Sequence, residues 1–421
     1  MEQDASPMLS SLISESQHDP GSTVIASKAP FPAELLLMIF HNVDDKDLLS
    51  VALSSKAVHD EAITVLFERD SQRPHTETGE PPKVPVWAVY NDMMPTMKRA
   101  LLHGGAKAIN ERGHARLGNH TEPFTPLCYA AWVGKMEFVK LFLEHGARIE
   151  EAEHIPTTEL MTIPLLASVE MTALGMALMQ GHTETAELLL AKGASVEVGW
   201  EYTQGNVTSL AYNALHAAAL HDNGDMIERL VREFGCSVTD ISTTYQGHLL
   251  PIHWAIFTAQ GAVNVQRLVS LGADVNARVG VFEDGTPLHW AIHGIPMFRN
   301  DNTTRATAAA LLAAGADINA LDRQRNSPLS MAVYLFQGPI VSFLLNWGAD
   351  VHAGHDETLV RAMELIPRYP VEREVRRCFR LMLGAGAALP EQAVEMAWEM
   401  GDDEDFSEML LAYYSPQEGD E

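Results

Sequence analysis

Three kinds of side chain in this sequence have types and spacing that could support chemistry: histidines, cysteines and clustered acids. The chain has 18 histidines, and His216, His253 and His289 occupy the same position in three recurring segments. A metal site needs ligands that converge on one point, so one histidine per recurring segment predicts no metal site. Cys128 lies beside an apolar helical pattern and is expected to be a small core residue rather than a nucleophile. The acidic cluster at 401–409 is expected to be a solvated cap.

The sequence contains none of the motifs that mark nucleotide, zinc-protease, serine-hydrolase or calcium chemistry. Cys128, Cys236 and Cys378 stand too far apart for a C-x-x-C metal knuckle, and an odd, sparse cysteine count is typical of a reducing compartment. We therefore predict no catalytic residues, no cofactor and no metal, and we expect the chain not to be an enzyme. An enzyme on this scaffold would need a tight pocket lined by converging His, Asp or Cys side chains.

The charge balance narrows the class of partner. Lys and Arg total 29 and Asp and Glu total 56, which gives a net charge of −27. Such an acidic surface repels nucleic acid and anionic membrane, so the expected partners are basic or apolar proteins. The first residues, MEQDASPM, do not form a secretory signal, and no apolar run approaches the roughly 18 residues of a membrane span. The expected location is the cytoplasm, the nucleus or both.

The elements that would position these side chains repeat along the chain. A Gly-Ala pair ends one apolar helical pattern after another, at 105, 146, 193, 272, 315, 348 and 386, with Gly235-Cys236 in the remaining place. Each helical start resembles Thr-Pro-Leu-His: TPLCYAA at 125, TALGMAL at 172, NALHAAA at 213, LPIHWAI at 250, TPLHWAI at 286 and SPLSMAV at 327. Recurrence of one helix–turn–helix unit predicts a solenoid, which offers an extended surface rather than a pocket.

Each repeating unit carries its own start and stop signals. Thr125, Thr172, Asn213, Thr286 and Ser327 are predicted helix N-caps, whose side-chain oxygens satisfy an otherwise unpaired amide. Proline follows four of the predicted starts, at the position where a missing N–H has no consequence. The second helix of each unit has a wide apolar stripe and ends at a glycine suited to left-handed backbone geometry.

This pattern resembles the ankyrin repeat from about residue 84 to residue 414. The resemblance implies an all-α ankyrin solenoid with short β-turn or hairpin loops, and a histidine in the TPLH position that hydrogen-bonds neighbouring turns together. The units here are longer than the family period of about 33 residues. The surplus lies in four inserts, at 151–171, 198–213, 239–248 and 294–305, which are predicted to be loops. Either these inserts contribute to recognition of a partner, or they reflect sequence drift in loops that tolerate insertions.

The domain organisation follows from composition. Residues 1–29 form an aperiodic, disordered lead, 30–70 a small helical unit and 71–83 a proline-rich linker. About eight ankyrin repeats occupy 84–390, the first and last of them degenerate, and 391–421 supply capping helices with an acidic tail.

Residues 30–70 resemble an F-box, in the form found at the head of fungal and other repeat proteins. The F-box family implies docking to the Skp adaptor of an SCF ubiquitin ligase. The expected adaptor contacts are Phe31, Pro32, Leu35, Leu36, Ile39, Phe40, Leu48, Leu49 and Leu53. Apolar residues run consecutively from 35 to 40 and cannot all face one small core, so some must meet another protein or pack back onto the solenoid.

A binding stripe is predicted on the first helices, which line the concave face of ankyrin repeats. The residue seven places after each N-cap would project from this face: Trp132, Met179, Leu220, Phe257, His293 and Tyr334. Five of these six are large and apolar or aromatic, which favours a protein target unless the long inserts cover them. The sequence thus predicts a substrate-recognition subunit of an SCF-type ligase. The alternative is a non-catalytic ankyrin scaffold or regulator without that role.

Overall fold

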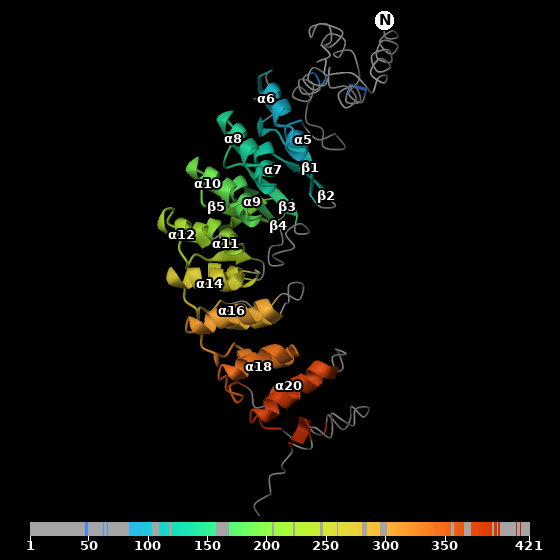
Figure 1. Ribbon diagram of the computed structural model, residues 1–421, viewed down its shortest axis with the longest axis vertical. Coiled ribbons are helices and arrows are strands. Elements are labelled where there is room, and N and C mark those ends of the chain that lie inside the picture. Colours follow the sequence, from blue (N-terminus) through green and yellow to red (C-terminus); the bar gives the residue numbers. More distant parts are fainter. Residues whose placement is uncertain are drawn as a thin grey trace, which may run out of the picture. The chain divides into compact units, whose positions relative to one another are not determined.

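The structure is a computed structural model (Figure 1). It describes residues 47–48, 62, 65, 84–102, 109–117, 120–156, 168–203, 206–221, 224–244, 247–258, 260–279, 284–294, 301–354, 358–365, 372–389, 391–393, 395, 410 and 413. The predicted F-box-like unit therefore lies mostly outside the described residues, and so do the adaptor contacts Phe31, Pro32, Leu35, Leu36, Ile39, Phe40, Leu49 and Leu53. Leu48 is described and fully buried, so it is a core side chain here rather than an exposed contact.

The chain forms two compact units. Unit 1 comprises 1–153 and 171–195, and unit 2 comprises 154–170 and 196–421. Helices come in consecutive pairs (Figure 1). The first helices are α5 (Val84–Tyr90), α7 (Pro126–Trp132), α9 (Ala173–Met179), α11 (Ala214–Ala219), α13 (Pro251–Ile256), α15 (Pro287–His293), α17 (Pro328–Tyr334) and α19 (Thr358–Leu365). The second helices are α6 (Met94–Leu102), α8 (Met136–Glu144), α10 (Thr183–Ala191), α12 (Gly224–Arg232), α14 (Gly261–Ser270), α16 (Asp301–Ala313), α18 (Gly338–Asn346) and α20 (Glu372–Gly384).

Within each unit, first helices pack on first helices and second helices on second helices. In unit 1, α5 packs on α7 and α7 on α9. In unit 2 the same order runs from α11 to α19 and from α12 to α20, and Figure 1 shows these pairs as successive layers. No helix among the described residues is both long and apolar enough to cross a membrane.

The predicted stop signals and four of the five predicted N-caps are confirmed; at the fifth, the Thr286 hydroxyl lies 2.9 Å from His289 Nδ1 and caps no backbone amide among the described residues. The Thr125 and Thr172 hydroxyls accept hydrogen bonds from the backbone N–H groups three residues later, and Asn213 and Ser327 cap their helices in the same way. The glycines that end the second helices have φ between +73° and +99°, a conformation that costs L-residues roughly 1–2 kcal/mol. Local sequence therefore sets the bounds of each helix.

The inserts differ from the prediction, because three of the four are β-hairpins rather than loops. The strands are β1 (Gly113–Leu117), β2 (His120–Phe124), β3 (Ala152–Pro156), β4 (Ser168–Thr172), β5 (Glu197–Thr203), β6 (Asn206–Asn213), β7 (Ser242–Thr244) and β8 (Gly247–Leu249). β1 pairs with β2 and β7 with β8, while β3 to β6 form one four-stranded sheet in chain order. Pairing satisfies backbone groups that a long irregular loop would leave to solvent.

The Ser242 hydroxyl is one link between the β7–β8 hairpin and the core of unit 2. Trp254 on α13 is fully buried, and its indole N–H donates to Ser242 Oγ at 3.0 Å. The Ser242 hydroxyl donates in turn to the carbonyl of Leu249 at 2.9 Å. Tyr212 stacks at a tilt against the same indole, with ring centroids 5.0 Å apart. The hairpin thus supplies the only hydrogen-bond partner that the described residues offer this indole.

Candidate protein-binding surface

The histidines of the TPLH position tie neighbouring turns together, as the resemblance implied. His216 Nε2 lies 3.3 Å from the carbonyl oxygen of Leu249, and His289 Nε2 lies 3.1 Å from that of Asn326. A carbonyl can only accept, so each of these two bonds requires its proton on Nε2. His253 is equally buried, but its Nε2 has no hydrogen-bond partner among the described residues. The hydrogen bond between neighbouring turns is therefore confirmed at two of the three histidine positions.

The other ring nitrogen of each histidine closes the start of its own helix. It accepts the backbone N–H of the N-cap residue three places earlier, at 3.2–3.4 Å: Asn213 to His216, Leu250 to His253 and Thr286 to His289. Ser330 does the same through its hydroxyl oxygen, 2.7 Å from the Ser327 nitrogen. The buried N-cap amide is satisfied locally throughout these repeats of unit 2.

Burial keeps these imidazoles neutral. It lowers the pKa of His216 to about 4 and that of His253 to about 3, and it also lowers the pKa of His289. The carbonyls of Leu249 and Asn326 act in the opposite direction on His216 and His289 but do not outweigh burial. His216 and His289 each use one nitrogen as a donor and the other as an acceptor, and only a neutral imidazole can do both.

Unit 1 satisfies one equivalent amide in a different way. The third helical residue after Thr125 is Cys128, and the Thr125 N–H donates instead to Glu153 Oε1 at 2.9 Å. Glu153 is 1% exposed and pairs with the Arg112 guanidinium at 2.9 Å. Burial raises the pKa of Glu153, while Arg112 and the Thr125 N–H oppose that rise. This pair could not be predicted from the sequence, because the carboxylate comes from an insert.

The cysteines occupy core positions, as predicted for Cys128. All three are free and buried. Burial raises the pKa of the Cys128 thiol, and it raises the pKa of Cys236 to about 11 and of Cys378 to about 12. The thiolate is the reactive form, so these side chains are poor nucleophiles at neutral pH. Among the described residues, no three His, Cys, Asp or Glu side chains come together as metal ligands.

The predicted binding positions lie at the carboxyl ends of the first helices, a set we call the first-helix stripe. In unit 1, Trp132 is half-buried and Met179 is only 2% exposed. In unit 2, Leu220 is 6% exposed, while Phe257, His293 and Tyr334 are half-buried.

The stripe is therefore not continuously exposed, and the prediction is wrong for Met179 and Leu220. Burying such an aliphatic side chain stabilises a fold by about 1.5–3 kcal/mol, which favours its packing onto the core over facing water. Phe257 is half covered because its ring meets Trp290 edge-on, with centroids 5.8 Å apart. Burial also raises the pKa of the Tyr334 phenol, against the opposing effects of Thr358 and Arg361.

Sequence reasoning missed the most exposed member of the stripe, Tyr90. This residue ends α5 as Trp132 ends α7, and 60% of it is exposed. The turn after α5 has Asp92 at φ 58° where the next turn has Gly134 at φ 71°. Because the glycine is missing, the sequence pattern alone does not align the two helices.

Tyr90 and Trp132 belong to adjacent repeats whose turns are linked. Asp92 pairs with Lys135 at 3.1 Å, and α5 packs on α7. The charges of this ion pair are largely exposed, so it positions the turns more than it stabilises them. An exposed aromatic residue beside a half-buried one, both on rigid helix ends, has the features of an anchor for a protein partner.

Comparison with known families identifies the repeats. Residues 85–199 and 158–244 match a family model described as ankyrin repeats in three copies, and residues 284–323 match a single ankyrin repeat. This chain contains ankyrin repeats. The matches lie inside the predicted 84–390 repeat region, and neither includes residues 30–70. Ankyrin repeats indicate a role in protein–protein interaction, and the exposed aromatic end of unit 1 is the part of the first-helix stripe best suited to it.

Proposed function

We propose that this protein is the substrate-recognition subunit of an SCF-type ubiquitin ligase. Residues 30–70 would dock a Skp-family adaptor and through it the cullin complex, and the ankyrin repeats would bind the target protein. The observation that carries the proposal is the F-box-like pattern at 30–70, with its consecutive apolar residues from 35 to 40, directly ahead of repeats that bind proteins.

The target surface in this proposal is the aromatic end of unit 1. Tyr90 and Trp132 supply large, stiff apolar contacts on helix ends, which cost little conformational entropy to immobilise. Phe257, His293 and Tyr334 in unit 2 offer further half-buried contacts. With a net charge of −27, the chain favours a basic or neutral protein target over nucleic acid or an anionic membrane.

The chain itself would perform no chemistry in this role. Holding a target near a ubiquitin-charged enzyme raises the effective concentration of the two reactants, and that alone accelerates transfer. Other subunits supply the reactive thioester. The proposal places the protein in the cytoplasm, the nucleus or both.

Co-purification with a Skp-family adaptor tests the first half of the proposal. Leu35→Asp combined with Ile39→Asp, in the full chain, is expected to abolish adaptor binding because two charges would enter an apolar interface. Circular dichroism should show unchanged helix content, which distinguishes a lost contact from a misfolded chain. Adaptor retention by the double variant would contradict the proposal.

Target capture tests the second half. The double variant Tyr90→Ser, Trp132→Ser is expected to weaken target capture at least 30-fold. This is the effect of losing one strong aromatic anchor, which contributes roughly 2 kcal/mol to binding. Trp347→Ser is the matched control, because Trp347 is 46% exposed but follows the second helix α18. Proteins retained by the wild type and the control, and lost from the double variant, should be ubiquitylated in cells only when the chain is present.

A plain ankyrin scaffold is the second candidate function. The observation that favours it is that the family matches begin at residue 85 and leave 30–70 without one. A scaffold would hold partners that depend on Tyr90 and Trp132, yet neither ubiquitylation nor adaptor would accompany them. The two experiments above therefore separate the candidates.

A further inference from the structure

Four pairs of consecutive turns are joined by a further hydrogen bond, in each case from one polar side chain; we call these bonds the second ladder. The side-chain oxygen accepts the backbone N–H of the equivalent place in the next turn. The two atoms are 2.8–2.9 Å apart at four positions: Asn110 to Arg148, Glu150 to Ser195, Asn276 to Asp317 and Asn319 to Asp350. These side chains follow the Gly-Ala pairs at 105, 146, 272 and 315, whereas the Ser237 N–H, after Gly235, donates within its own turn to Asp240 Oδ2 at 2.9 Å.

An asparagine in this position uses both ends of its carboxamide. Asn110 Nδ2 donates to the Gly146 carbonyl at 3.3 Å, and Asn276 Nδ2 donates to the Gly315 carbonyl at 3.2 Å. Each next turn therefore presents a donor and an acceptor side by side, and one carboxamide satisfies the pair.

At the next position the ladder breaks, because His352 stands where the preceding turns have asparagine. Its backbone is placed as theirs is: His352 N–H donates to Asp350 Oδ1 at 2.9 Å, compared with 3.0 Å for the Asn319 N–H to Asp317 Oδ1. The following turn is Gly386-Ala387-Ala388, which also keeps its geometry, with Gly386 at φ 94°. Among the described residues, however, no side chain accepts the Ala388 N–H.

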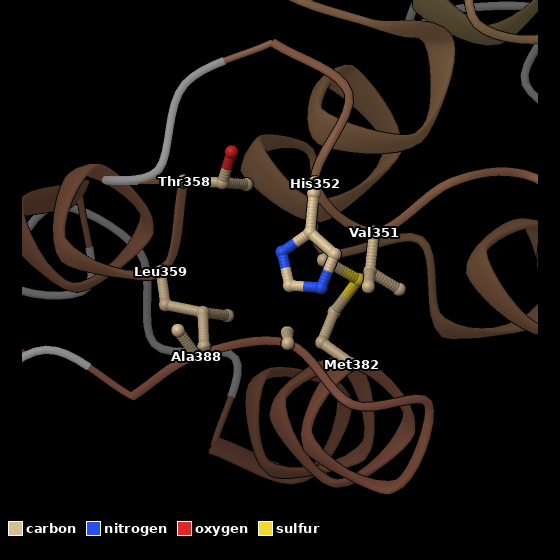
Figure 2. Close-up of a pocket in the computed structure, with 7 residues that line it drawn as sticks. Val351, His352, Thr358, Leu359, Met382 and Ala388 are labelled. Carbon is tan, nitrogen blue, oxygen red and sulfur yellow. The ribbon is translucent and has the colours of Figure 1, made fainter.

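A cavity of about 70 Å³ lies beside this position, lined by His352 and by Ala387 and Ala388 of the following turn (Figure 2). Leu359 and Met382 form its apolar wall, and both are buried. His352 and Ala388 lie at its rim and are exposed, so the cavity opens at the surface. Figure 2 shows the His352 ring pointing toward the space between Leu359 and Met382.

We propose that this cavity binds the side-chain carboxamide of an asparagine presented by a partner protein. The carboxamide oxygen accepts the Ala388 N–H and its NH₂ group donates to the Gly386 carbonyl, as Asn110 and Asn276 do toward their own next turns. The partner's asparagine thus completes the rung that His352 leaves open. The site lies in unit 2, apart from Tyr90 and Trp132, and does not depend on a ubiquitin-ligase role.

Two observations favour a carboxamide over a carboxylate. A carboxylate has no donor for the Gly386 carbonyl, whereas the asparagines at 110 and 276 satisfy the corresponding carbonyls. The net charge of −27 also opposes the approach of an anion. Glu150 fills one rung as a carboxylate, but it is part of the chain and pays no such approach cost.

The decisive probe is N-acetyl-asparagine N-methylamide, titrated into the full-length chain and followed by the backbone amide NMR signals. The Ala388 signal is expected to shift in a saturable manner at millimolar probe, while the Asp350 signal stays fixed because Asn319 already occupies its rung. N-acetyl-leucine N-methylamide is the control. An equal shift with the leucine probe, or no shift with the asparagine probe, would overturn the proposal.

Two reciprocal variants test the ladder itself. His352→Asn closes the site with the chain's own carboxamide, so the probe should no longer shift Ala388, and exchange of the Ala388 amide should slow about fivefold, the effect of one hydrogen bond. Asn319→His should open a second site and make the Asp350 signal responsive. Probe binding that persists in His352→Asn overturns the assignment. So does dimerisation of the wild type that His352→Asn abolishes, because a second copy would then be the occupant.

Discussion

The two units satisfy the same buried amide with different chemistry. At α11, α13 and α15 of unit 2, an imidazole three residues along the helix accepts the N-cap N–H and is held neutral by burial. At α7 of unit 1 a carboxylate 28 residues away accepts it and is held beside an arginine. A local neutral acceptor makes each repeat self-sufficient, whereas a distant charged one ties the repeat to an insert and an ion pair.

The consequence is an opposite response to pH. The folded pKa values of His216 and His253, about 4 and about 3, lie below the unfolded value near 6.5, so the unfolded chain binds more protons as the pH falls. Their contribution to stability is complete above pH 6.5 and is lost toward pH 4. Glu153 has a raised pKa, so acid relieves its burial rather than adding to it.

Acidification should therefore have the largest effect, and it should be confined to unit 2. Between pH 7.5 and pH 5, each of the two histidines is expected to remove about 2 kcal/mol from the free energy of unfolding, roughly 4 kcal/mol together. Hydrogen exchange of amides on α13 and α7 measures the two units separately. Equal losses of protection on both helices would contradict the comparison.

Replacing one histidine should remove its share of that effect. His253→Ser keeps an acceptor for the Leu250 N–H, since Ser330 plays this part at α17, but it removes the titrating group. We expect the variant to be less stable than the wild type at pH 7.5 because of the space left behind. Its loss between pH 7.5 and pH 5 should be smaller by about 2 kcal/mol. Urea unfolding monitored at both pH values gives the comparison.

Breaking the ion pair of unit 1 should show the opposite pH dependence. Arg112→Met leaves Glu153 buried without its cation, and because the Arg112 side chain is 51% exposed we expect a loss of about 1–2 kcal/mol, less than for a fully buried pair. The pKa of Glu153 should rise further, so the variant should approach wild-type stability in acid and depart from it as the pH rises.

A double variant checks the cause. Glu153→Gln retains an acceptor for the Thr125 N–H and has no charge to compensate, so Arg112→Met should cost far less in that background. Chemical denaturation of the four proteins of the cycle gives the coupling energy. Additive losses would show that Arg112 acts through packing alone.

The smallest effect is expected at an exposed pair in the same unit. Arg148 lies 3.2 Å from Glu151, and the Arg148 side chain is 69% exposed. Arg148→Gln should change the free energy of unfolding by less than about 0.5 kcal/mol. This variant is the reference for the Arg112 measurement. It also removes a guanidinium group, but it leaves no buried carboxylate without its partner.

The parts of the fold that sequence predicted are those decided within a few residues. Thr125 accepts a hydrogen bond from an amide three positions away. Gly315 adopts a φ of 94° without strain because glycine has no Cβ. The neighbouring-turn contacts of His216 and His289 were predictable only because the resemblance to a repeat family supplied the next turn. Because the unit repeats, a contact with the next turn could be predicted in the same way as a contact within one helix.

The parts that sequence missed depend on contacts that do not repeat. Glu153 lies in an insert 28 residues after Thr125, and nothing in its sequence neighbourhood pointed to that residue. The exposure of Met179 and Leu220 could not be predicted, because one position in the repeat can face the core or solvent according to its neighbours. Tyr90 was missed because Asp92 takes a backbone conformation that usually identifies a glycine.

The hydroxyl bridge between Ser242 and Trp254 limits how this chain can be shortened. Cutting out 242–249 would bring one unit nearer the common repeat length, yet it would strand an indole N–H in a dry interior. A designer who wants a compact version must change the tryptophan in the same step, for example to phenylalanine. The insertion looks dispensable in the sequence, but the buried tryptophan of this repeat requires it.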